Sequence, residues 1–119
     1  MAEFRFQKLE IWQIAIEIAD TLFDIADNLE QRKLFRFADQ LRGAGMSMSN
    51  NIAEGSGSSF KKVFNRYLDD ARNSAFENAN IAILLCRRKL ISEKQKEDIL
   101  EDLDKFCRKT SSFQKSLNR

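Results

Sequence analysis

The chain has 119 residues, 43% of them hydrophobic, which predicts a single folded domain over residues 1–119. Its twenty basic and eighteen acidic side chains give a net charge of +2, too small to indicate a nucleic-acid partner by itself. Histidine is absent, which excludes the Glu-x-x-His pairs of di-iron bundles, the zincin helix and the serine triad.

Two further absences bear on architecture and compartment. Proline is missing, so no residue forces a helix to break, and long helices are permitted everywhere. The N-terminus has no basic segment followed by an apolar one, and the longest wholly apolar run is Ile81 to Cys86. No signal peptide or membrane span is therefore expected, and with only two cysteines the reducing cytoplasm is the simplest compartment.

Apolar periodicity predicts a first helix from about Leu9 to Asn28. The apolar stripe on this helix is wide, which indicates contact with more than one neighbouring helix. A turn is expected at residues 28–33. The stripe consists of two adjacent seams, Ile11, Ile14, Ile18 and Ile25 on one and Trp12, Ala15, Ala19, Leu22 and Ala26 on the other.

The second predicted helix runs to about residue 54 and contains Gly43 and Gly45. A glycine inside a helix costs roughly 1 kcal/mol relative to alanine, so the pair indicates close approach of a neighbouring backbone or ligand. Beyond them, Gly55 is expected to end this helix as a C-cap glycine. Either Ser58 or Ser59 is then expected to begin the third helix as its N-cap.

The third predicted helix spans about residues 59–89 and has Ser74 and Asn78 where a bundle core is normally apolar. Both side chains need hydrogen-bond partners, since an unsatisfied buried polar group costs about 1 to 3 kcal/mol. A fourth helix begins at a capping box formed by Ser92 and Gln95. Four helices joined by short loops predict an all-α, antiparallel, up-down-up-down four-helix bundle.

Three parts of the sequence form motifs that occur together. The first is Gln40-Leu41-Arg42, then Ser47, then Asn51-Ile52-Ala53-Glu54-Gly55; the second is Leu9-Glu10-Ile11-Trp12-Gln13-Ile14-Ala15; the third consists of Phe64, Leu68, Ala71, Arg72, Ser74 and Glu77. They resemble, in turn, the central motif, the opening L-x-V-W-x-x-A and the third-helix pattern of the four-helix-bundle proteins first described as products of 23S rRNA intervening sequences. The resemblance extends from about Phe6 to Leu117.

The resemblance implies an assembly and partners. Members of the family form homopentameric rings or barrels, so a homo-oligomer, most simply a pentamer, is implied here. A related branch serves as the accessory protein of diversity-generating retroelements and binds reverse transcriptase and RNA through a basic surface. The implied function is a non-enzymatic assembly protein without a cofactor that binds RNA, DNA or a nucleic-acid enzyme. The alternative is a purely structural or protein-docking bundle.

Apolar residues outside the predicted seams also favour an oligomer. Phe35 and Phe76 lie off the seams that build one bundle, and the first helix has two apolar seams. Inside a monomer these residues would crowd the core, and on its surface they would form an exposed apolar patch.

Asn51 and Glu54 are the residues most easily taken for a chemical site. The structural interpretation is that Asn51 hydrogen-bonds across helices and fixes their register, while Glu54 pairs with Lys61 or Lys62. Other motifs are weaker. The Ser-x-x-Lys match beginning at Ser58 lacks its companion motifs, and the carboxylates of the fourth helix alternate with lysines as on a solvated face.

Basic residues gather at one predicted end of the bundle. An up-down-up-down order places the turn between the second and third helices beside both chain termini. This end holds nine basic and three acidic side chains, a net charge of +6, against +3 at the other end. A surface of this kind attracts phosphates, although ordinary solubilising charges are the alternative interpretation. The predicted nucleic-acid contacts are Arg5, Lys8, Lys61, Lys62, Arg66, Arg108, Lys109 and Lys115.

Overall fold

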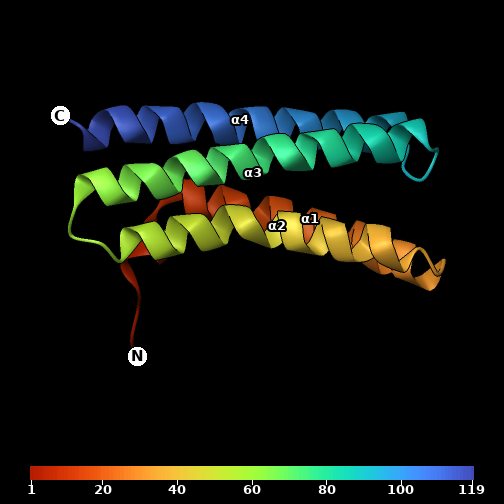
Figure 1. The fold of residues 1–119 in the computed structure, drawn as a ribbon, viewed down its shortest axis with the longest axis horizontal. Coiled ribbons are helices and arrows are strands. Elements are labelled where there is room, and N and C mark those ends of the chain that lie inside the picture. Colours follow the sequence, from red (N-terminus) through yellow and green to blue (C-terminus); the bar gives the residue numbers. More distant parts are fainter.

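The computed structural model describes all 119 residues and contains four long antiparallel helices and no strand (Figure 1). The chain turns back three times along an axis 45 Å long, and both of its ends lie toward the same end of the bundle as the α2–α3 turn. This arrangement confirms the predicted all-α up-down-up-down bundle. The elements are η1, a short 3-10 helix (Arg5–Lys8), α1 (Glu10–Gln31), α2 (Phe35–Ser56), α3 (Lys61–Arg87) and α4 (Glu93–Leu117).

Each helix packs mainly against its neighbours in the sequence. α2 contacts both α1 and α3, and α3 also contacts α4, whereas the contact between α1 and α4 is much sparser. The apolar seams converge on one continuous core, in which Leu22, Met48, Leu68 and Phe106 are fully buried. Most residues of both predicted seams of α1 belong to this core or pack against it, so the wide apolar stripe of α1 is used mainly within one protomer.

The turns after α1 and α3, at the other end of the bundle, share one geometry. Lys33 and Lys89 have φ values of 63° and 62°, in the left-handed region. In each turn the following leucine N–H donates to a leucine carbonyl five positions earlier, at 2.9 and 2.8 Å. This is the Schellman arrangement, which satisfies carbonyls left free at a helix end. A left-handed lysine costs about 1 to 2 kcal/mol that a glycine would avoid.

The starts of α3 and α4 differ in how they are capped. α4 begins as predicted, because Ser92 Oγ accepts from Gln95 N–H at 3.0 Å while Gln95 Oε1 accepts from Ser92 N–H at 2.8 Å. The N-cap of α3 is Phe60, and no side chain caps that helix. Ser58 Oγ accepts instead from Phe60 N–H at 3.0 Å. The prediction that Ser58 or Ser59 caps α3 is therefore wrong, because the serines belong to the turn.

Gly55 lies at a close approach of α2 to α3. It lies buried inside α2 and does not end that helix, contrary to the prediction. A Cβ at this position would lie 2.6 Å from Tyr67 Cβ and 2.9 Å from a ring carbon of Phe64, so only glycine fits. At Gly43 the predicted close approach of a neighbouring backbone is not made within the protomer, since its Cβ would meet nothing within 4 Å. At Gly45 the nearest atom would lie at 3.4 Å, an ordinary van der Waals distance.

Candidate nucleic-acid interface

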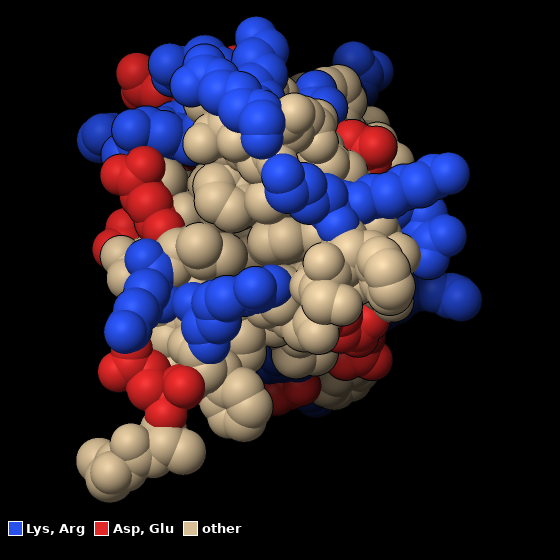
Figure 2. Space-filling model, turned by 90° about the vertical axis from the view of Figure 1, so that its left-hand side faces the viewer, with Lys and Arg blue, Asp and Glu red and all other residues tan.

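Four segments meet at the end of the bundle that holds the α2–α3 turn, which we call the basic end: η1, the turn itself, the first turns of α3 and the last turns of α4. Figure 2 looks onto this end and shows many lysine and arginine side chains around a tan central surface, with fewer acidic side chains among them. All eight predicted contact residues have exposed side chains. The basic end therefore presents its cations to solvent.

Three of the eight predicted cations are already paired with carboxylates. A phosphate approaching them would compete with these carboxylates, so they contribute less uncompensated charge than the others. The pairs are Lys8 with Glu3 at 3.8 Å, Lys109 with Glu10 at 3.2 Å and Arg108 with Asp104 at 2.9 Å.

Arg5 has a structural role that sequence patterns did not indicate. Its guanidinium donates hydrogen bonds to the main-chain oxygens of Ser56 and Ser58, the second at 3.4 Å. It also lies over the ring of Phe64, 5.8 Å from the ring centroid. These contacts fasten η1 to the α2–α3 turn and keep a positive charge beside an aromatic face.

Four of the predicted contact residues on α3 and α4 form no ion pair, and we call them the basic cluster: Lys61, Lys62, Arg66 and Lys115. Lys61 Nζ donates only to the main-chain oxygen of Arg119, at 3.4 Å. Lys61 and Lys62 open α3, where the helix dipole is positive and no side chain caps the free N–H groups. The basic cluster therefore offers positive charge that no acidic side chain of the protomer pairs with.

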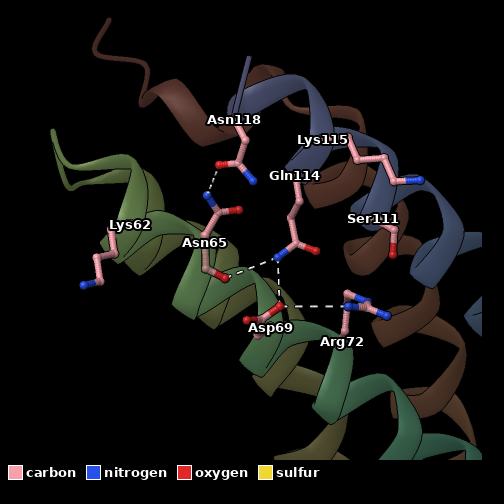
Figure 3. Close-up of a pocket in the computed structure, with 8 residues that line it drawn as sticks. All are labelled: Lys62, Asn65, Asp69, Arg72, Ser111, Gln114, Lys115 and Asn118. Carbon is pink, nitrogen blue, oxygen red and sulfur yellow. Dashed lines mark hydrogen bonds and ion pairs between the residues drawn. The ribbon is translucent and has the colours of Figure 1, made fainter.

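A polar groove of about 630 Å³ lies between α3 and α4 beside the basic cluster (Figure 3). Gln114 Nε2 joins the two helices by donating to Asp69 Oδ1 at 2.9 Å and to Asn65 O at 3.3 Å. Asn65 Nδ2 donates to Asn118 Oδ1 at 2.6 Å. Asn65 Oδ1 and Arg72 Nε are buried without a hydrogen-bond partner, so this network is incomplete. The lining residues are Lys62, Asn65, Asp69, Arg72, Ser111, Gln114, Lys115 and Asn118.

A smaller hollow of about 290 Å³, the end pocket, is mainly apolar. Phe64 and Phe113 meet edge to face within it, with ring centroids 5.7 Å apart, and Phe60 is 70% exposed at its border. Arg5 and Lys61 supply its charge, and no acidic residue lines it. Sequence reasoning missed this pocket, although an aromatic residue directly before two lysines was an available signal. The lining residues are Arg5, Leu9, Ser58, Ser59, Phe60, Lys61, Phe64, Phe113 and Leu117.

The polar motif residues of α2 and α3 hold these helices together. Ser47 Oγ and Ser74 Oγ lie 2.7 Å apart, and the fully buried Asn78 donates to Ala44 O across the helices at 2.8 Å. Asn51 donates instead to Ser47 O within α2, at 2.9 Å. The prediction that Asn51 links two helices is therefore wrong, because its amide reaches a carbonyl one turn back and Asn78 makes the link.

The acidic motif residues Glu54 and Glu77 are exposed and form no ion pair. The predicted pair of Glu54 with Lys61 or Lys62 is therefore not formed. Glu54 has no lysine partner because Lys61 lines the end pocket and Lys62 lines the polar groove.

Arg42 joins α2 to α1 through two carboxylates. It donates to Asp27 Oδ1 at 2.8 Å and to Glu30 Oε1 at 3.0 Å. These hydrogen bonds, the one to Asp27 foremost, raise the pKa of the Arg42 guanidinium above its ordinary value. Arg72 lies in the polar groove, where it pairs with Asp69 of its own helix at 3.9 Å.

Metal ligation, membrane insertion and disulfide formation each require a particular arrangement of residues. Nowhere do three or more cysteine, aspartate or glutamate side chains gather as ligands for a metal ion. None of the helices combines the length and apolar character needed to cross a membrane. Cys86 and Cys107 are both free and half-buried.

The fold and these contacts define an all-α, up-down four-helix bundle with a polar link between α2 and α3 and a basic end. Residues 7–112 match the model of the 23S rRNA-intervening sequence protein family, and the chain belongs to this family. A protein of unknown function from the S23 ribosomal protein family of Bacteroides thetaiotaomicron has a similar crystal structure, with a TM-score of 0.82 and 24% identity over 88% of this chain and 98% of that one. Comparison with curated proteins finds no match.

Proposed function

We propose that this protein is a non-enzymatic assembly protein that binds nucleic acid through its basic end. The observation that carries the proposal is the basic cluster, four exposed cations without carboxylate partners at the start of α3 and the end of α4. Phosphates suit such a cluster, because each phosphate that a cation neutralises releases condensed counterions. The nearly neutral protomer thus presents four unpaired cations close together on α3 and α4, where a nucleic acid can reach them.

Charge reversal of the cluster tests this proposal. We expect Lys61→Glu, Lys62→Glu, Arg66→Glu to weaken the binding of RNA and DNA of any sequence. The slope of log affinity against log salt should flatten by about 2 to 3, since each phosphate contact contributes about 0.7 to 0.9. Fluorescence anisotropy over a salt series measures both quantities, with circular dichroism and oligomer mass as checks on folding.

The matched control is Lys33→Glu, Arg36→Glu, Arg88→Glu at the other end of the bundle. These residues are also exposed and form no ion pair, so the control changes the net charge equally. The control should bind nearly as well as the wild type. Equal losses in the two variants, or a wild type without salt-sensitive binding to either nucleic acid, would contradict the proposal.

We further propose that the chain forms a homo-oligomer, with a pentameric ring as the form that the family resemblance implies. Surface composition supports this, since Phe35, Phe76, Ile83 and Leu84 are 56%, 68%, 46% and 43% exposed. Apolar side chains of this size on one small bundle favour association. A ring would repeat the basic end around one rim. Light scattering should give about five times 13.8 kDa, and a mass near 13.8 kDa would contradict any oligomer.

A protein-docking bundle is the second candidate, with reverse transcriptase or another nucleic-acid enzyme as the partner. An apolar groove of about 210 Å³ between α3 and α4, lined by Phe76, Leu100, Leu103 and Cys107 among others, favours this function. The test is co-purification with a reverse transcriptase encoded beside the gene. Phe76→Asp should abolish that association, whereas an altered oligomer mass in the same variant would assign the groove to self-association.

A further inference from the structure

The end pocket contains a residue that neither helix stability nor phosphate binding explains. Phe60 occupies the N-cap of α3, where serine, threonine, aspartate or asparagine would satisfy a free N–H group. A phenylalanine ring satisfies none, and this ring is also 70% exposed, so little of it is buried in the core. A residue that breaks a local rule without a gain for the fold indicates a functional position.

The surroundings of Phe60 define the chemistry of a ligand. Phe64 and Phe113 make the pocket aromatic, and the positive charges of Arg5 and Lys61 border it. Its volume of about 290 Å³ is close to the lower limit of about 300 Å³ for small-ligand pockets, which leaves room for one planar ring system. An aromatic hollow bordered by cations and free of acidic side chains suits a flat heterocycle that carries a negative group.

We propose that the end pocket receives one unpaired base of a single-stranded nucleic acid, with Phe60 as its stacking surface. Arg5 and Lys61 then lie where they can meet the phosphates next to that base. This proposal rests on the proposed function and narrows it, because paired bases inside a duplex have no free face for stacking. RNA and DNA strands share this chemistry, and since every base has a flat face the pocket should tolerate any sequence.

The arrangement of charge around the pocket favours a nucleic-acid strand as the occupant. Lys62 and Lys115 of the basic cluster line the neighbouring polar groove, so a strand with its base in the end pocket finds further cations beside it. Figure 2 shows blue side chains on several sides of the tan surface at the basic end. An apolar peptide would gain nothing from that ring of positive charge.

Phe60→Ala tests the stacking role, with Phe4→Ala as the matched control. Phe4 is 66% exposed on the N-terminal arm but does not line the end pocket. We expect Phe60→Ala to bind single strands roughly 5- to 30-fold more weakly, the range for loss of one stacked base. Its salt dependence should match the wild type, because no phosphate contact is removed. Phe4→Ala should change the affinity little, and Phe60→Trp should retain it.

A second measurement separates stacking from affinity. The fluorescence of a single strand containing 2-aminopurine should change on binding to the wild type and to Phe60→Trp, and should change much less on binding to Phe60→Ala. The same strand made abasic keeps its phosphates and should bind the wild type and Phe60→Ala equally. A duplex of the same length should bind more weakly than the single strand and should not respond to Phe60→Ala.

The outcomes distinguish this inference from the proposed function. Three results would overturn the stacking proposal and leave nucleic-acid binding intact. They are salt-sensitive binding that Phe60→Ala does not weaken, an equal loss of binding in Phe4→Ala, and tighter binding of duplex than of single strands. A wild type that shows no salt-sensitive binding to RNA or DNA would overturn both.

Discussion

Replacing Gly55 with alanine should destabilise the bundle, although alanine is the better helix former. The new methyl group would lie 2.6 Å from Tyr67 Cβ and 2.9 Å from a ring carbon of Phe64. A Cβ atom is fixed to its backbone, so Tyr67 cannot turn away without moving α3. The two helices must therefore separate at this point, and the contacts on both sides of it weaken.

The size of the effect follows from two opposing terms. Overpacking costs typically about 1 to 3 kcal/mol, and a contact against a Cβ atom belongs in the upper half of that range. Alanine recovers about 1 kcal/mol of helix propensity. The free energy of unfolding should therefore fall by about 1 to 2 kcal/mol. Gly43→Ala is the control, because its methyl group meets nothing within 4 Å and only the gain of about 1 kcal/mol remains.

Urea unfolding followed by far-UV circular dichroism measures both variants against the wild type. The protein concentration must be the same throughout, since association makes apparent stability depend on concentration. With a denaturant slope of about 2 kcal/mol per molar urea, the two midpoints should move in opposite directions and differ by about 1 to 1.5 M. A Gly55→Ala midpoint equal to or above that of the wild type would refute the close-approach argument.

Three further predictions concern other parts of the fold. Lys33→Gly and Lys89→Gly should each raise the free energy of unfolding by about 0.5 to 1 kcal/mol, because glycine adopts the left-handed conformation without the cost that lysine bears there. Unchanged urea midpoints would contradict this prediction. Asn78→Asp buries a carboxyl group, and burial raises the pKa of that group in the folded state. The variant should therefore approach wild-type stability as the pH falls from 7 toward 4. A difference in urea midpoint that stays constant with pH would argue against burial. Burial raises the pKa of the Cys107 thiol, so iodoacetamide should alkylate it more slowly than free cysteine near neutral pH. The alkylation rate, measured by mass spectrometry, should keep increasing into more alkaline solution.

The sequence predicted the bundle because helical periodicity and capping are local properties. Four apolar seams and the Ser92 capping box were enough to place the helices and their order. Two polar core positions, Ser74 and Asn78, were also recognisable as groups that need partners. Their partners were not, because the choice between Asn51 and Asn78 depends on the rotation of one helix against another, which periodicity alone does not determine.

The glycines and the basic end show the same limit. Local propensity assigns the same cost to Gly43 and Gly55, and only the crossing of α2 and α3 distinguishes them. The topology placed the eight cations at one end, but the ion pairs that occupy Lys8, Arg108 and Lys109 depend on side-chain positions. The end pocket combines residues from η1 to the end of α4, which lie far apart along the chain and meet only in the folded protein.

The sparse contact between α1 and α4 makes α4 the helix that can leave the bundle at the lowest cost. Native proteins open locally where contacts are fewest, and amide hydrogens there exchange with solvent first. The last turns of α4 line both the polar groove and the end pocket, through Gln114 and Leu117 respectively. Detachment of this helix would dismantle both sites together. A strand bound across them would in turn hold α4 closed, so occupancy of the basic end and the stability of the closed bundle are thermodynamically linked.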